Sequence, residues 1–288
     1  GGGAPRLAIY STLVETRDHY KRGDFLLEAV RMKCSAERLG STLPHHLIYG
    51  GGLSAEELDV LRHFGFVIED HTSDVPYVQS MYRPVYSHAE ARRQGRRWRG
   101  AAGAADVSGR GDGWATYFKF FAWRARRFDV VLHADLDLCF WGRSPERALL
   151  DVAAALLARN SSASAAGFVP RLRHRGRFNS ALFALRPSEE VFQDLFRRAG
   201  AGEYVPADNS EQDVLNDRFP AASDPGNAVD NLDALVPHDA WCSHERSAFA
   251  LGEHCLREND ALIARRLLAA GCQDFWDSCV AYRVDTSY

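Results

Sequence analysis

The sequence lacks any apolar run of about 18 residues, the length that a membrane-spanning helix needs, so no segment is expected to cross a bilayer. It also lacks a strong excess of charge of either sign, since the formal net charge is −3 and the pI is near 6.4. Proteins that hold nucleic acid by its phosphates usually carry a basic surface. The charge balance therefore gives no reason to expect a nucleic-acid partner.

The six cysteines include no C-x-x-C pair, which argues against a structural zinc site. Four of them lie between Cys242 and Cys279, where one or two disulfides are an alternative to buried free thiols, the simpler expectation. No secretory signal is recognisable, and residues 1–5, which begin with three glycines, are expected to be a cloning remnant. The sequon Asn160-Ser161-Ser162 would be used only in the secretory route.

No internal repeat and no clear linker divides the 288 residues, which are 46% hydrophobic and 25% charged, so a single globular domain over 1–288 is expected. One stretch differs in character. Residues 90–113 are rich in Arg, Gly and Ala, show no periodicity and are predicted to form a mobile loop. An alternative is that the arginines of Arg92–Gly113 close over a diphosphate.

Apolar runs and helical periodicities alternate along the chain, which favours an α/β fold with a mostly parallel sheet flanked by helices. Strands are predicted at 6–14, 46–49, 66–69, 130–132, 166–169, 181–185 and 232–236. Helices are predicted at 23–39, from Ser54 to near Gly65, at 114–127, from Ser144 onward, and at 188–199, 209–217 and 260–270. Ser54 and Glu57 have the spacing of a capping box.

The stretch Phe128–Phe140 carries the strongest chemical signal. Its apolar run is typical of a buried strand and ends at Asp135 and Asp137, whose side chains point to the same side in extended backbone. Two carboxylates at the carboxyl end of a buried strand need a positive partner. A divalent cation, Mn²⁺ or Mg²⁺, carrying a diphosphate would supply that charge, whereas two solvated acids in a turn are the plainer alternative.

Five segments occur in a characteristic order between Arg6 and Asp217: YSTLVETRDHYKRG, YFKFFAW, VVLHADLD, RFNSALFALRPS and DNSEQDVLN. Together they resemble family-8 glycosyltransferases, the glycogenin-like group. The resemblance implies a GT-A fold, which is Rossmann-like, a nucleotide-sugar donor, usually a UDP-sugar, a Mn²⁺ ion with Mg²⁺ as the alternative, and transfer with retention of anomeric configuration.

The resemblance also implies roles for individual residues. Donor contacts would come from Thr12, Thr16, Arg17, Tyr20, Lys119, Asp135 and Leu136. Among these, Tyr20 would stack on the base, and Lys119 would neutralise the departing phosphate. Arg17 stands where the family has a small polar residue.

The metal would be held by Asp135, Asp137 and a third ligand, for which His254 is preferred over His238 and His244, because the family's H-x-x-G-x-x-K element is not recognisable. The catalytic set would be Lys119, Asn179, Asp208, Glu211 and Gln212, and Ser180 matches the same family segment as Asn179. Glu211 replaces an aspartate of the family, so stabilisation of an oxocarbenium-like centre by Glu211 or Gln212 is favoured over covalent attack. Asp213 is an alternative acid.

The expected reaction moves a sugar from a UDP-sugar to the hydroxyl of a glycan or glycoprotein acceptor, which residues 224–288 would bind. The Golgi lumen is preferred over the cytoplasm as its location. Three alternatives stay open: a sugar- or nucleotide-binding module without turnover, an inverting GT-A transferase, and a nucleotidyltransferase on a similar sheet.

Overall fold

The computed structural model describes residues 3–14, 24–82, 113–136, 138, 140, 144–158, 166–170, 178–204, 210–219 and 230–231. The predicted mobile loop, the strand at 232–236, the helix at 260–270 and the acceptor-binding region all lie outside these residues, apart from Gly113 and the pair 230–231. Among the described helices, none has the length and apolar character to cross a membrane.

The first half of the chain alternates strands and helices as the sequence predicts. Its elements are β1 (Leu7–Val14), α1 (Asp24–Arg38), β2 (His45–Gly51), α2 (Ala55–His63) and β3 (Phe66–Asp70). The predicted capping box opens α2: the Glu57 amide donates to Ser54 Oγ at 3.3 Å and the Ser54 amide donates to Glu57 Oε2 at 2.6 Å. These reciprocal bonds satisfy two amide groups that have no partner within the helix.

The second half is more irregular. It contains η1 (Thr72–Asp74), α3 (Val75–Met81), η2 (Ala115–Arg124), β4 (Val130–Ala134), α5 (Pro145–Ala158), β5 (Ala166–Pro170), β6 (Phe178–Leu185), α6 (Glu189–Ala201), α7 (Glu211–Arg218) and β7 (Asp230–Asn231). The sequence did not predict α3. It also placed the start of β6 three residues too late.

The strands form one sheet in the order β3-β2-β1-β4-β6-β5-β7. Six of them run in one direction, and β6 alone pairs antiparallel with both of its neighbours. The expected α/β class, with a mostly parallel sheet flanked by helices, is therefore confirmed. The strand order reverses next to β1, which has β2 on one side and β4 on the other. In open α/β sheets, ligands bind outside the carboxyl ends of the strands at such a switch point.

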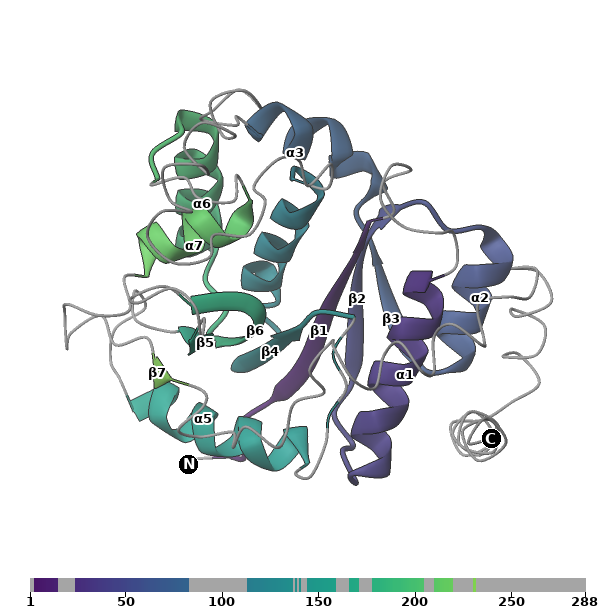
Figure 1. Cartoon of the computed structure of the whole chain (residues 1–288). Coiled ribbons are helices and arrows are strands. Elements are labelled where there is room, and N and C mark those ends of the chain that lie inside the picture. The colour runs from purple at the N-terminus through teal and green to yellow at the C-terminus, as the bar shows by residue number, and fades with distance from the viewer. Residues whose placement is uncertain are drawn as a thin grey trace, which may run out of the picture.

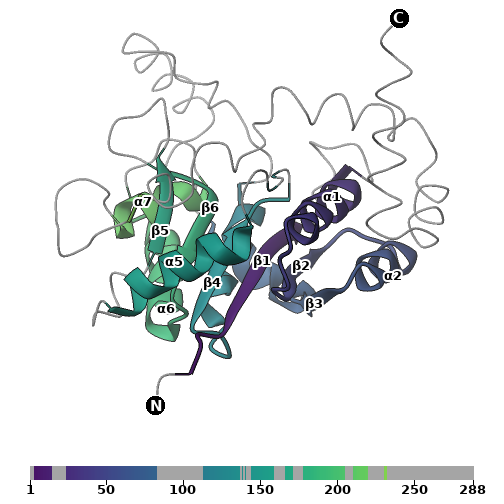
Figure 2. The same ribbon diagram turned by 90° about the horizontal axis from the view of Figure 1, so that it is seen from below.

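Helices cover both faces of the sheet. Figure 1 shows α1, α2 and α5 on one side and α3, α6 and α7 on the other, and Figure 2 shows the same layers from below. Each side has its own apolar core: Leu7, Ile9 and Leu132 pack toward α1, α2 and α5, whereas Ala8 and Val131 pack toward η2, α3, α6 and α7. Because both faces are buried, the central strands β1 and β4 are mostly apolar on both faces rather than alternating.

The predicted helix at 114–127 is a 3₁₀ helix over Ala115–Arg124. Eight of its ten residues are buried, including the aromatic run Tyr117–Trp123. A 3₁₀ helix has three residues per turn, so side chains three apart stand in line. Thr116 and Lys119 therefore lie on one edge of η2, and both reach the same region beyond the sheet.

Cys34, which is fully buried in α1, is disulfide-bonded, so the expectation of a free thiol is wrong at this position. The other five cysteines lie outside the described residues. Cysteine spacing alone gives no pairing, because the partners are set by which segments the fold brings together.

Candidate functional site

Polar side chains converge at the carboxyl ends of the central strands. Asp135 follows β4 directly, and its backbone amide donates to Ala181 O in β6 at 2.8 Å. Because β6 is antiparallel, its first residues lie beside the end of β4. The edge beside the switch point is thus built from the end of β4, the start of β6 and the two helices that approach it, η2 and α7.

Lys119 joins two carboxylates at this edge. Its Nζ lies 2.8 Å from Asp135 Oδ1 and 3.0 Å from Oδ2, and 2.8 Å from Glu211 Oε1. It also donates to Ser180 O at 3.4 Å. The side chains of Lys119 and Glu211 are 11% and 3% exposed, whereas that of Asp135 is 27% exposed. Asp135 is therefore the member of this set that opens to solvent.

Backbone and hydroxyl groups fix Glu211 in place. Ser180 Oγ donates to Glu211 Oε1 at 2.6 Å, and the Glu211 amide donates to Thr116 Oγ1 at 3.2 Å. The Ser180 amide donates to Gln212 Oε1 at 3.1 Å. Since every bond crosses between elements far apart in sequence, they fix the relative positions of η2, β6 and α7. These residues are called the Lys119 cluster below: Thr116, Lys119, Asp135, Ser180, Glu211 and Gln212.

Burial and charge act against each other in this cluster. Burial alone would lower the pKa of Lys119, but the charges of Asp135 and Glu211 outweigh it and raise that pKa. Burial alone would raise the pKa of Glu211, but Lys119 and hydrogen bonds from Ser180 and Thr116 lower it. Both side chains are therefore charged at neutral pH, and the cluster holds a fixed ammonium beside two carboxylates.

A second polar contact joins β1 to β4 at the same edge. Thr12 Oγ1 lies 3.0 Å from His133 Nε2. His133 is completely buried and stacks on Phe183, with ring centroids 4.8 Å apart. Burial and the nearby charge of Lys119 lower the pKa of His133 well below its usual value. The imidazole is therefore neutral.

The structure brings together six of the residues that the sequence singles out: Thr12, Lys119, Asp135, Ser180, Glu211 and Gln212. Leu136 packs its side chain in the core on the α1 and α5 side, and Asn179 lies in β6 beside Ser180, with its backbone alone described. The remaining predicted site residues lie outside the described part of the chain: Thr16, Arg17, Tyr20, Asp137, Asp208 and His254. Among described residues, no group of three His, Cys, Asp or Glu forms a metal-binding cluster.

Two members of the site were missed in the sequence, Thr116 and His133. Thr116 stands three residues before Lys119, and in a 3₁₀ helix that spacing would have placed it on the same edge. His133 stands two residues before Asp135 in a strand, which places both side chains on the same face. The signals were present, but each needed the correct element type first.

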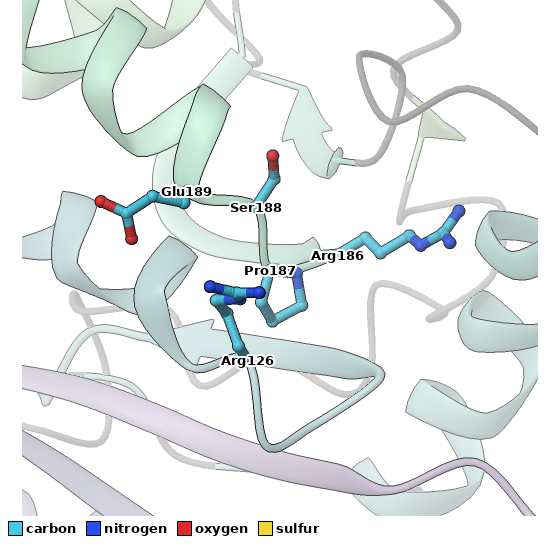
Figure 3. A pocket seen from close by; sticks show the side chains of 5 residues that line it. All are labelled: Arg126, Arg186, Pro187, Ser188 and Glu189. Carbon is cyan, nitrogen blue, oxygen red and sulfur yellow. The ribbon is translucent and has the colours of Figure 1, made fainter.

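A pocket of about 310 Å³ lies at the other end of the strands, near the start of β4. It is lined by Arg126, Arg186, Pro187, Ser188 and Glu189. Figure 3 shows the two arginines extending in different directions around Pro187. Arg126 comes before β4 and the other residues follow β6 or begin α6. The start of β4 and the end of the antiparallel β6 lie side by side, at the end of the sheet opposite to the carboxyl end of β4. The pocket is therefore separate from the Lys119 cluster.

No protein-family model and no curated protein matches this chain. Among solved structures, it is similar to the galactosyltransferase LgtC in complex with donor and acceptor sugar analogs, at 13% identity and a TM-score of 0.43 over 91% of this chain and 95% of that one. It is also similar to apo GlyE of Streptococcus pneumoniae, at 13% identity and a TM-score of 0.47 over 93% of this chain and 64% of that one.

The bifunctional glycosyltransferase WbbM shows 12% identity and a TM-score of 0.46 over 76% of this chain. The matched part is 38% of WbbM, so this chain spans well under half of that protein. These are likenesses with TM-scores below 0.5. The case for a function therefore rests on the chain's own residues.

Proposed function

We propose that this chain is a metal-dependent, retaining GT-A glycosyltransferase that takes a sugar from a UDP-sugar and transfers it to the hydroxyl of a glycan or glycoprotein. The observation that carries the proposal is the Lys119 cluster at the sheet's switch point: a buried ammonium held between Asp135 and Glu211. A diphosphate leaving group needs fixed positive charge at this edge of an α/β sheet.

Lys119 supplies part of that charge from the protein itself. Asp135, Glu211 and Ser180 fix the position of its ammonium. Because one ammonium and two carboxylates leave one negative charge in excess, Lys119 would act on the departing phosphate together with the ion that Asp135 would bind. A lysine free in solvent would lose side-chain entropy on ordering. The buried bridge to Glu211 removes that loss in advance, which is the advantage of a preorganised site.

Asp135 fits a hard divalent cation. Its carboxylate contacts the Lys119 ammonium and is partly open to solvent. It also belongs to the class of oxygen ligands that Mn²⁺ and Mg²⁺ prefer. Asp137 and His254 would complete the ligand set. When bound, the ion would act as a Lewis acid on the diphosphate. The chain's own contribution is to hold Asp135 at the strand end, where Lys119 and the ion would share it.

In the proposed reaction, the bond between the anomeric carbon and the donor phosphate oxygen breaks, and a bond to the acceptor oxygen forms. The acceptor proton passes to the departing phosphate oxygen. Glu211 is placed to hold Lys119, because Lys119 and Ser180 already occupy its Oε1. Gln212, Asn179 and Asp208 would orient the sugar, and residues 224–288 would bind the acceptor.

The test compares two aspartates at opposite ends of one strand. Asp135→Asn changes the proposed ligand after β4, whereas Asp129→Asn changes an acid before β4 that pairs with Arg6 and is similarly exposed, at 35%. UDP binding is measured by calorimetry with Mn²⁺ and with EDTA, and release of UDP from a panel of UDP-sugars is measured with Mn²⁺.

The parent and Asp129→Asn should bind UDP more tightly with Mn²⁺ and hydrolyse one UDP-sugar slowly. Asp135→Asn should lose about 100-fold in hydrolysis, the range for an electrostatic contact at the reacting centre. UDP binding that is indifferent to EDTA contradicts the metal, and binding without hydrolysis of any donor favours a module without turnover. Analysis of the product anomer separates retention from inversion.

A further inference from the structure

We propose that His133 is a positioning residue that orients the Thr12 hydroxyl toward an acceptor oxygen of the donor nucleotide. The proposal rests on the proposed function, since it concerns how the same site holds its nucleoside diphosphate. It assigns a task to a buried histidine for which the reaction outlined above has no other use.

The contact bridges the two strands on either side of the switch point. Thr12 lies near the carboxyl end of β1 and His133 near that of β4, and the Thr12 Oγ1 to His133 Nε2 distance is 3.0 Å. Thr12 is half-buried and His133 is fully buried. A hydroxyl at this position stands at the border between the packed sheet and the crevice where a ligand would bind.

The burial of His133 decides which atom donates. Within the described residues, Nδ1 of His133 is buried and has no hydrogen-bond partner. An unpaired buried N–H is rarer in proteins than an unpaired acceptor, so a bare Nδ1 is the less costly state. A ring proton therefore sits on Nε2, where it donates to Thr12 Oγ1.

This direction of donation fixes the role of Thr12. Because its oxygen accepts from His133, the hydroxyl hydrogen remains to be donated elsewhere. The stack of His133 on Phe183, with an interplanar angle of 10°, holds the ring and thus the hydroxyl. A donated O–H selects an acceptor oxygen, and a uridine nucleotide offers these on its base, ribose and phosphates. The place of Thr12 near the carboxyl end of β1, beside the switch point, assigns this hydroxyl to the donor nucleotide.

The experiment measures the Kd of UDP by calorimetry in two backgrounds. His133→Met removes the N–H donor and fills the site with an apolar side chain of similar length. His133→Gln instead retains an N–H near the position of Nε2. His133→Met should weaken UDP binding about 5- to 10-fold, the range expected for one hydrogen bond, and His133→Gln should restore most of it. In a Thr12→Val background, His133→Met should change the Kd less than twofold.

The control is His45→Met, which removes a buried imidazole from the neighbouring strand β2. It should leave the Kd of UDP unchanged, because His45 stands at the amino end of β2 and, within the described residues, both of its ring nitrogens lack a hydrogen-bond partner. An equal loss of UDP binding for His133→Met with and without Thr12→Val would overturn the proposal, because a merely structural histidine acts independently of the hydroxyl.

Two arms keep the test decisive. If His133→Met does not fold, Thr12→Val alone must weaken UDP binding by the same 5- to 10-fold factor, and parent-like binding contradicts the proposal. Uridine separates the ligand atoms: a parallel loss for uridine and UDP assigns a nucleoside oxygen, and a loss for UDP alone assigns a phosphate oxygen. A parent chain that binds no UDP refutes the proposed function itself, which is a different result.

Discussion

Two ion clusters stand on the same sheet and differ in burial. In the Lys119 cluster the ammonium and Glu211 are almost completely buried. In the other, called the Arg127 cluster (Tyr10, His46, Glu69 and Arg127), the Arg127 side chain is 53% exposed and Glu69 is 23% exposed. Tyr10 donates to Glu69 Oε1 at 2.7 Å, and His46 Nδ1 lies 2.9 Å from the same oxygen.

The difference in burial separates two uses of charge. An exposed pair is screened by water and contributes little to stability, whereas breaking a buried pair leaves an unpaired charge in a poorly solvated place. The Arg127 cluster joins β1, β2 and β3 to Arg127, which precedes the amino end of β4. The Lys119 cluster stands at the edge where ligands bind, so its burial keeps charge ready for a ligand. The four predictions below test this contrast.

The largest effect is expected for Lys119→Met. Glu211 would stay buried without its cation, so the free energy of unfolding should fall by about 3–5 kcal/mol, and UDP-sugar hydrolysis should fall at least about 100-fold. Urea denaturation and UDP release give the two values. Lys33→Met is the matched control, because Lys33 is also buried but pairs with the half-exposed Glu37 in α1.

A double variant sharpens this result. Lys119→Met with Glu211→Leu removes both buried charges, so most of the lost stability should return. Hydrolysis should stay low, because no ammonium faces the donor. Recovery of hydrolysis together with stability would show that the cluster serves folding alone.

The second effect is a pH dependence. The pKa of Glu211 in the folded chain is lowered below its ordinary value of 4.5, so its contribution to stability is fully present above 4.5 and is lost as pH falls through the folded pKa. Glu211→Gln should therefore be less stable than the parent at neutral pH, and the gap should narrow below pH 4.5.

Glu69→Gln provides the comparison for this titration. Burial alone would raise the pKa of Glu69, but hydrogen bonds from His46 and Tyr10 and the charge of Arg127 lower it. The stability difference between Glu69→Gln and the parent should also shrink as pH falls. It should be smaller than the difference for Glu211→Gln, because Glu69 is more exposed. Thermal melts from pH 3 to pH 7 measure both, and a larger gap for Glu69→Gln would reverse the contrast.

A smaller effect is expected for Ser180→Ala, which removes the hydroxyl that donates to Glu211 at 2.6 Å. The loss of one hydrogen bond to a buried charged group should lower the free energy of unfolding by about 1.5–3 kcal/mol. Ser80→Ala is the matched control, since Ser80 is exposed in α3 and donates to Tyr77 O. Equal losses for the two serines would contradict the burial argument.

The smallest effect is expected for Arg127→Met. Its guanidinium is half exposed, so the free energy of unfolding should fall by about 1 kcal/mol or less, and the loss should shrink at high salt. UDP binding should match the parent. A loss as large as that of Lys119→Met would mean that exposure does not separate the two clusters.

The sequence anticipated those parts of the fold and site that depend on local pattern. Ser54 and Glu57 fixed the start of α2, and the acid after an apolar run located Asp135 at a strand end. The contacts of Lys119 with Glu211 and Ser180 could not be predicted, because they join elements 61 and 92 positions apart (180 − 119 and 211 − 119). Hydrophobic periodicity over a short stretch predicts which face of a helix or strand a residue occupies. Tertiary packing decides which of these faces come into contact.

The antiparallel direction of β6 illustrates what the sequence can and cannot predict. Apolar runs reveal strands but not their direction. Seven residues separate β5 from β6, which is too short for the crossover that parallel neighbours need, so this antiparallel pair was open to prediction. Its pairing with β4 was not, because those strands are far apart in sequence. The 3₁₀ form of η2 was equally hidden, since its apolar residues suit any buried helix.

The 3₁₀ helix also restricts which insertions and deletions the chain can accept during evolution. One residue added or removed within Ala115–Lys119 would turn everything after it by about 120°, a third of a three-residue turn. Lys119 would then face the aromatic core, and a phenylalanine would face the carboxylates. The length of this short segment is therefore fixed by the spacing of Thr116 and Lys119 along η2.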